Sequence, residues 1–128
     1  RRFFSWSTRM KEVTRLDELE ALSAGEQTLL LDFYMTTCPP CRRLAVELDA
    51  LEAEGKLPVL LCKVDAERLP QAAARYGVRG VPAFFLIRSG KVLAQGVGYR
   101  TRAELAAWIE TALNVEPDSG AAPAKPSG

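Results

Sequence analysis

The amino-acid sequence predicts an α/β fold in which a central mixed β-sheet is flanked by α-helices on both faces. Short apolar runs of strand length alternate with longer segments whose apolar residues recur at helical spacing, which is typical of strand–helix–strand units. Near the end, two strand-like runs follow one another across a tight turn and add an antiparallel hairpin. The 128 residues are enough for one hydrophobic core, so we expect a single domain.

The expected elements are a strand at 11–13, a helix from Thr14 to Gly25, a strand at 28–34, a helix at 42–54, a strand at 58–64, a helix at 69–76, strands at 83–87 and 92–97, and a helix opening at Thr101. The runs at 28–34 and 58–64 are almost continuously apolar, which indicates strands buried on both faces. Thr14 with Asp17, and Thr101 with Glu104, resemble capping boxes at helix starts.

Segments of different composition lie on either side of this domain, which we place at residues 11–114. Residues 1–10 are basic and aromatic without a clear period, so we expect an N-terminal arm there. Residues 115–128 are rich in Pro, Ser, Gly and Ala, which is typical of a disordered tail. The first residue is Arg rather than Met, so an exported protein with an upstream segment removed is an alternative to a cytoplasmic one.

The composition argues against a nucleic-acid partner, a membrane span and a disulfide-stapled scaffold. Seventeen basic and sixteen acidic residues give a net charge of +1, so no nucleic-acid partner is expected. The sequence contains no apolar run of the roughly twenty residues that a membrane span requires. Three cysteines are too few for a disulfide-stapled scaffold.

Cys38 and Cys41 form a C-x-x-C pair where a buried strand meets a helix. Residues three apart in a helical turn bring their side chains within about 5–6 Å, so a disulfide can open and close there with little backbone movement. The helix N-terminus favours the thiolate of Cys38, and Pro39 and Pro40 stiffen the first turn. We therefore expect Cys38, at an exposed helix tip, to attack and Cys41 to resolve the mixed disulfide.

Other interpretations of the pair fit less well. A structural zinc site needs four ligands, and the sequence has neither a second C-x-x-C nor any histidine. An incidental pair of cysteines is not expected in a strand–C-x-x-C–helix context. We therefore expect no metal and no cofactor beyond the redox-active disulfide itself.

Asp32 is a lone charge inside a buried strand, six residues before the first cysteine. Burial of a carboxylate is costly, so the pKa of Asp32 should be raised. It could then accept the proton of Cys41 when that thiol attacks. The alternative is a structural ion pair with Lys63, the charge in the neighbouring buried strand.

Two further features have a purely structural interpretation as well as a functional one. Cys62 should point away from Lys63 and serve as a small apolar core residue, with a regulatory thiol as the alternative. Pro82 can simply start a strand, but together with Gly77 and Gly80 it indicates a special turn.

The chain resembles the thioredoxin family over residues 11–114. The resemblance rests on four segments in the family's order: LLLDFYMTTCPPCRR, LLCKVDAE, YGVRGVPAFFLIRSG and GVGY. It implies the thioredoxin fold. Two positions depart from the family's usual pattern, because Thr37 replaces a Trp and Pro-Pro replaces Gly-Pro between the cysteines. The first change implies a more polar groove rim, and the second changes the dipeptide that tunes the redox potential.

The resemblance also implies a role for each matching residue. Cys38 is the nucleophile and Cys41 the resolving cysteine. Asp32 is the buried proton acceptor, tuned by Lys63, and Pro82 is a cis-proline beside the disulfide. The residues implied to line the substrate groove are Thr37, Pro39, Pro40, Gly80, Val81, Val97, Gly98 and Tyr99.

The expected function is reduction of protein disulfides by dithiol exchange. The expected partners are disulfide-containing proteins and a thioredoxin reductase, and we expect a cytoplasmic monomer. One alternative is an exported or membrane-tethered oxidoreductase with a narrow set of partners. Another is a thioredoxin-fold scaffold subunit whose cysteines are dispensable.

Overall fold

A computed structural model describes residues 10–114 and shows nine elements in the predicted order. They are β1 (Met10–Glu12), α1 (Leu16–Ala24), β2 (Leu29–Tyr34), α2 (Pro39–Ala53), β3 (Leu60–Asp65), α3 (Pro70–Arg75), β4 (Ala83–Arg88), β5 (Lys91–Val97) and α4 (Arg102–Leu113). The predicted arm and tail lie outside the described residues, apart from Met10, which begins β1.

The five strands form one mixed sheet in the order β1-β3-β2-β4-β5. β1, β3 and β2 are parallel, whereas β4 is antiparallel to β2 and β5 is antiparallel to β4. The carboxyl ends of β2 and β3 therefore lie at the same end of the sheet as the start of β4 and the end of β5. The chain segments that carry the predicted site meet at this end.

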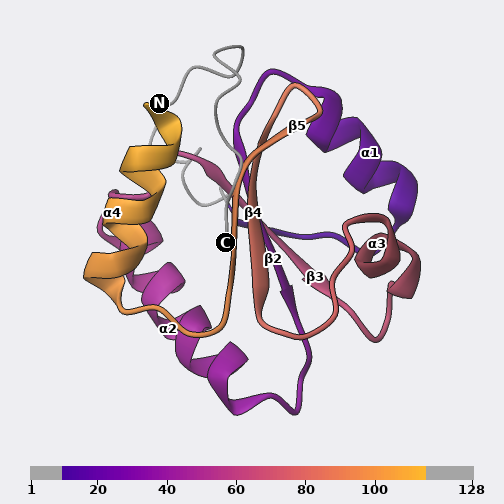
Figure 1. Cartoon of the computed structure of the whole chain (residues 1–128), viewed down its shortest axis with the longest axis horizontal. Helices are drawn as coiled ribbons and strands as arrows, with labels where there is room; N and C mark the ends of the chain where they lie inside the picture. The colour runs from indigo at the N-terminus through magenta and orange to yellow at the C-terminus, as the bar shows by residue number, and fades with distance from the viewer. Residues whose placement is uncertain (1–9, 115–128) are drawn as a thin grey trace.

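Helices cover both faces of the sheet, with α1 and α3 on one side and α2 and α4 on the other (Figure 1). Two separate clusters of buried apolar side chains result, because alternate residues of a strand point to opposite faces. Phe33, Tyr76 and Phe85 pack together on the α1/α3 side, with ring centroids 5.3–5.8 Å apart. On the α2/α4 side, Phe84 packs edge-on against Trp108.

The two predicted capping boxes have different outcomes. The box of α4 is confirmed, because Thr101 Oγ1 accepts from the Glu104 N–H and Glu104 Oε1 accepts from the Thr101 N–H. The predicted box of α1 is wrong, since Arg15 is the N-cap residue and its guanidinium binds Asp17. The Val13 N–H donates to the Lys63 carbonyl at 2.8 Å, so sheet pairing continues past β1 and delays the helix start.

Gly96 on β5 lies opposite Phe84, and a Cβ there would come 2.6 Å from Phe84 Cε2. Phe84 cannot move freely, because it is held between Trp108 and the Arg100 guanidinium. We expect Gly96→Ala to lower the free energy of unfolding by about 1–3 kcal/mol, the usual cost of overpacking. Gly80→Ala is the matched control for this urea-unfolding measurement, since a Cβ added at Gly80 would meet no heavy atom within 4 Å. Equal stabilities for the two variants would contradict the prediction.

Candidate active site

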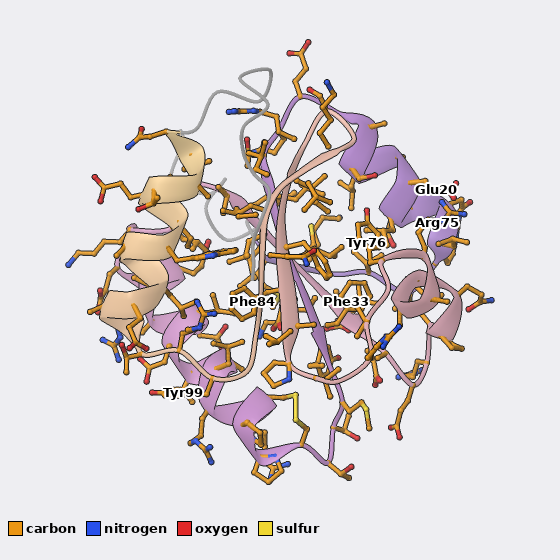
Figure 2. The ribbon with its side chains drawn as sticks, in the orientation of Figure 1. Glu20, Phe33, Arg75, Tyr76, Phe84 and Tyr99 are labelled. Carbon is orange, nitrogen blue, oxygen red and sulfur yellow. A yellow bond between two sulfur atoms is a disulfide. The ribbon has the colours of Figure 1, made fainter. Side chains whose placement is uncertain are left out.

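The two cysteines of the C-x-x-C segment form a disulfide at the N-terminus of α2 (Figure 2). Their Cα atoms are 5.2 Å apart, within the usual range for a disulfide. Cys38 is the N-cap residue, and its Sγ accepts a hydrogen bond from the Cys41 backbone N–H at 3.3 Å. Pro39 begins the helix, where a missing N–H costs no intrahelical bond. The fold therefore places the cross-link at the positive end of a helix.

Cys38 is less accessible than the sequence predicts. The sequence favours an exposed helix tip, but only 8% of Cys38 is exposed, against 3% of Cys41. The cause is the loop before β4, because the Val81 carbonyl oxygen lies 3.8 Å from Cys38 Sγ. Cys38 is still the more accessible of the two cysteines, and its role as the one that meets a substrate stays a prediction.

A groove beside the disulfide is formed by the loop before β4 and by β5. The Val81–Pro82 peptide bond is cis, which is the predicted geometry. The Gly98 N–H donates to the Pro82 carbonyl at 2.9 Å and ties the end of β5 to this loop. Gly98 has φ +83°, which glycine adopts without steric cost. The groove is lined by residues from 76–83 and 92–98, which include the predicted Gly80, Val81, Val97 and Gly98.

The other residues predicted to contact substrate lie outside the lining of this groove. Thr37 and Pro39 are exposed on either side of Cys38, Pro40 is half-buried, and 38% of Tyr99 is exposed. They provide a surface around the disulfide rather than the walls of a pocket. Their contact with substrate stays a prediction.

Asp32 and Lys63 are Cα partners on neighbouring strands, β2 and β3. Asp32 lies two residues after Leu30, whose side chain packs in the α2/α4 cluster, so the carboxyl faces the helix that carries the cysteines. It is 2% exposed, and its Oδ1 has no hydrogen-bond partner among residues 10–114. The sequence therefore located a buried carboxyl correctly.

Burial raises the pKa of Asp32 to about 7, and the nearby positive charge of Lys63 opposes this rise. The Lys63 ammonium does not bind Asp32 directly, because its Nζ lies 3.3 Å from Asp49 Oδ1 on α2. The alternative of an Asp32–Lys63 ion pair is therefore wrong within residues 10–114, because the carboxylate that Lys63 binds is that of Asp49. Asp32 is left able to exchange a proton near neutral pH.

Cys62 is fully buried in the α1/α3 cluster, on the opposite face from Lys63. Burial raises the pKa of its thiol to about 12, so the reactive thiolate is scarce at neutral pH. These observations favour the prediction of a small apolar core residue over that of a regulatory thiol.

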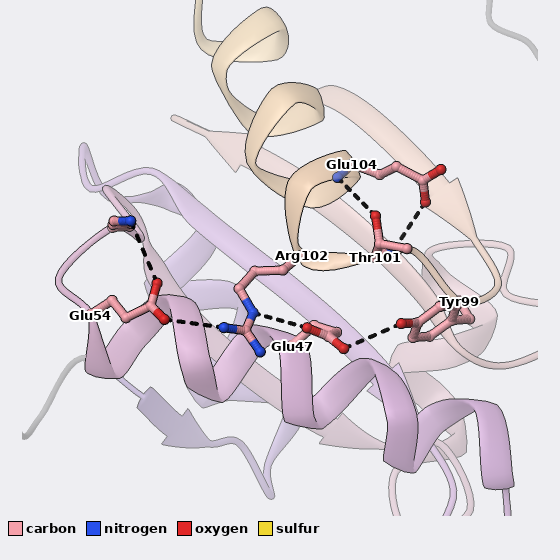
Figure 3. Close-up of polar contacts among 7 residues, drawn as sticks. Glu47, Glu54, Tyr99, Thr101, Arg102 and Glu104 are labelled. Atoms are coloured by element: carbon pink, nitrogen blue, oxygen red, sulfur yellow. Dashed lines mark hydrogen bonds and ion pairs between the residues drawn. The ribbon is translucent and has the colours of Figure 1, made fainter.

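Sequence reasoning missed a polar cluster that joins α2 to the segment after β5 (Figure 3). The Glu47 carboxylate accepts from the Tyr99 hydroxyl at 3.2 Å and from Arg102 Nε at 3.0 Å. Arg102 also binds Glu54, and the Arg43 guanidinium lies over the Tyr99 ring, 5.6 Å from its centroid. No spacing in the sequence points to this cluster, because Glu47 and Arg102 are 55 residues apart.

The match to known proteins covers most of the described chain. The thioredoxin family model matches residues 11–111. The chain belongs to the thioredoxin family. It is therefore a thiol–disulfide oxidoreductase whose redox-active centre is the Cys38–Cys41 pair. Electrons in this family are carried by the cysteines themselves, so the chemistry needs no cofactor.

Similar proteins support this assignment. Thioredoxin C-2 of Corynebacterium nephridii is 36% identical over 86 residues, which cover 67% of this chain and 80% of that protein. The thioredoxin of Rhodospirillum rubrum is 29% identical over 104 residues, covering 81% of this chain and all of the relative. Among solved structures, a mutant thioredoxin from Halobacterium salinarum matches with a TM-score of 0.74 and 27% identity, over 86% of this chain and 96% of that one.

The helices within residues 10–114 of this thioredoxin-family chain are shorter than a bilayer is thick. α2 has 15 residues, whereas a membrane crossing needs about 20 apolar ones. Within residues 10–114, no helix has the length and apolar content that such a crossing requires.

The pKa of Asp32 predicts how stability depends on pH. The value is about 7 in the folded protein and about 4 in an unfolded chain, so the unfolded state loses this proton first as pH rises. The free energy of unfolding should therefore fall by up to about 4 kcal/mol between about pH 4 and pH 7. Asp32→Asn removes this contribution, so the variant should gain stability relative to the parent as pH rises. Urea unfolding at a series of pH values measures the difference, and a constant difference would contradict the prediction.

Proposed function

We propose that this thioredoxin-family protein works as a reductase of protein disulfides. One observation carries the proposal: Cys38 Sγ caps α2, accepts the Cys41 N–H, and lies beside the carbonyl of Val81, a residue that lines the groove. The helix N-terminus favours a negative charge on Cys38, and a reductase needs a thiolate at neutral pH. The backbone of Val81, next to the sulfur, is placed to pair with an extended substrate segment.

The proposed reaction has two exchange steps. In the first, the Cys38 thiolate attacks one sulfur of the substrate disulfide, the substrate S–S bond breaks, and the released substrate sulfur leaves as a thiolate that takes up a proton. In the second, Cys41 loses its proton and attacks the Cys38 sulfur. This step forms the Cys38–Cys41 disulfide and releases the second substrate thiolate. Two electrons move from the cysteine pair to the substrate.

Asp32 is the group we propose to take the proton from Cys41. Both residues are buried, Asp32 at 2% and Cys41 at 3% exposed, so bulk water has little access to the thiol as a proton acceptor. With its pKa raised to about 7, the Asp32 carboxylate can accept a proton and return it at neutral pH. Lys63, on the adjacent strand, opposes the rise in this pKa and so keeps part of the population ionised.

A second protein must return the two electrons after each cycle, and we propose a thioredoxin reductase as that partner. We also propose that the chain acts as a cytoplasmic monomer, since disulfide reduction belongs to a reducing compartment and one chain supplies every group of the site. An exported oxidoreductase with a narrow partner set is the alternative. Recycling by a thioredoxin reductase and NADPH discriminates the two, because a dedicated exported protein should not be recycled.

Removing either active-site sulfur should abolish turnover. We expect Cys38→Ser to reduce insulin at no more than the uncatalysed rate, because no nucleophile remains. Cys41→Ser should stop at the mixed disulfide, detectable by mass spectrometry as a covalent adduct on Cys38. Cys62→Ser is the matched control and should retain activity, since Cys62 lies in the opposite core cluster. Turnover by Cys38→Ser equal to that of the parent would reject the oxidoreductase mechanism in favour of a scaffold role.

Asp32→Asn should slow the second exchange step and not the first. We expect roughly a tenfold to hundredfold slower release of the mixed disulfide at neutral pH, which is typical of losing a general base. Rapid-quench trapping of the adduct follows this rate directly. Asp49→Asn is a suitable comparison, because it removes the carboxylate that binds Lys63 and leaves Asp32 in place. If resolution in Asp32→Asn keeps the parental rate, Asp32 is a structural charge only.

A further inference from the structure

We propose that the preferred substrates carry acidic residues next to their disulfide, and that three arginines around Cys38 select them. We call Arg42, Arg43 and Arg79 the basic rim. This inference rests on the proposed function, because it specifies which disulfides the same site reduces. The chemical class is an extended protein segment with aspartates or glutamates flanking its cysteines.

The first two rim arginines are held in place by the fold. Arg42 Nη1 donates to the Thr36 carbonyl at 2.9 Å, which draws the guanidinium toward the loop that precedes Cys38. Arg43 lies over the ring of Tyr99, whose hydroxyl is bound by Glu47. Both are exposed, so their remaining N–H groups face solvent. Side chains fixed in advance lose less conformational entropy when a partner binds.

Arg79 belongs to a different segment, the loop before β4. It lies two residues before Val81, the residue whose carbonyl contacts Cys38 Sγ, and it is exposed in the lining of the groove. A substrate segment that lies along Val81 would therefore have Arg79 beside it. The three arginines therefore come from two separate segments, the start of α2 and the loop before β4, and both segments adjoin Cys38.

The charges of the rim are not neutralised within the described part of the protein. None of the three arginines forms an ion pair with any residue in 10–114, in contrast to Arg15, Arg75 and Arg102. The Glu47 carboxylate on α2 is paired with Arg102, whereas Asp65 and Glu104 accept backbone N–H groups and keep their charge. Glu67 is also exposed, and the next residue in the sequence is the exposed Arg68.

Three arginines without an ion pair in residues 10–114 thus lie in the two segments that adjoin the sulfur, in a chain whose net charge is only +1. Charges of one sign around a reactive group raise the association rate of oppositely charged partners, typically by about 10-fold or more at low ionic strength. Acidic residues beside a substrate disulfide would also form charge-assisted hydrogen bonds with the free guanidinium N–H groups. The predicted result is faster reduction of acidic substrates at equal chemical reactivity.

Two synthetic disulfide peptides test the proposal, one with glutamates flanking the cysteines and one with lysines. The second-order rate constant for their reduction by the pre-reduced protein is measured at about 0.01 M and about 1 M ionic strength, where charges act over about 30 Å and 3 Å. The rim variant is Arg42→Gln/Arg43→Gln/Arg79→Gln. The control variant is Lys56→Gln/Arg88→Gln/Lys91→Gln, which removes the same charge from the far end of the sheet.

We expect the parent and the control variant to prefer the glutamate peptide by about tenfold at low ionic strength, with the preference lost at high ionic strength. In the rim variant, the rate constant for the glutamate peptide divided by that for the lysine peptide should be about tenfold smaller than in the parent. Comparing ratios between proteins cancels the intrinsic reactivity of each peptide. An equal ratio in all three proteins overturns the proposed selectivity while the reductase function stands. Failure of the parent to reduce either peptide, or insulin, would reject the function itself.

Discussion

The hydrogen bond from the Cys41 backbone N–H to the Cys38 sulfur is the contact on which the active site depends. It exists because α2 begins directly after Cys38, and the first turn of a helix has N–H groups without intrahelical acceptors. The sulfur takes the place of the usual capping oxygen. One contact thus favours a negative charge on Cys38, keeps the two cysteines within bonding distance, and turns Cys38 toward the Val81 carbonyl.

The position of α2 over the sheet has a second consequence, the burial of Asp32. Burial disfavours the ionised form of this carboxyl in the folded protein, whereas the unfolded chain ionises it freely in water. The free energy of unfolding is therefore lower above the pH at which an exposed aspartate ionises. The two apolar clusters on the faces of the sheet offset this cost. A destabilising group retained in a core is typical of a functional site, and here it lies on the sheet face that α2 covers.

Much of the fold was predictable because local patterns and tertiary packing agree. Continuous apolar runs became the central strands β2 and β3, and leucines repeated at helical spacing became the buried face of α2. The errors arose where a distant partner changed a local preference. Pairing of Val13 with β3 displaced the start of α1, and the loop around Val81 covered a cysteine expected to be exposed.

The sequence by itself determined the fold class, the spacing of the cysteine pair and the burial of Asp32, since each depends on residues close together in the chain. Only the tertiary structure decided that Lys63 binds Asp49, that Glu47 joins Tyr99 to Arg102, and which arginines stand unpaired with carboxylates around the disulfide within residues 10–114. These contacts join residues far apart in sequence. Hydrophobic periodicity carries no information about such pairs, because charged surface residues fit any exposed position.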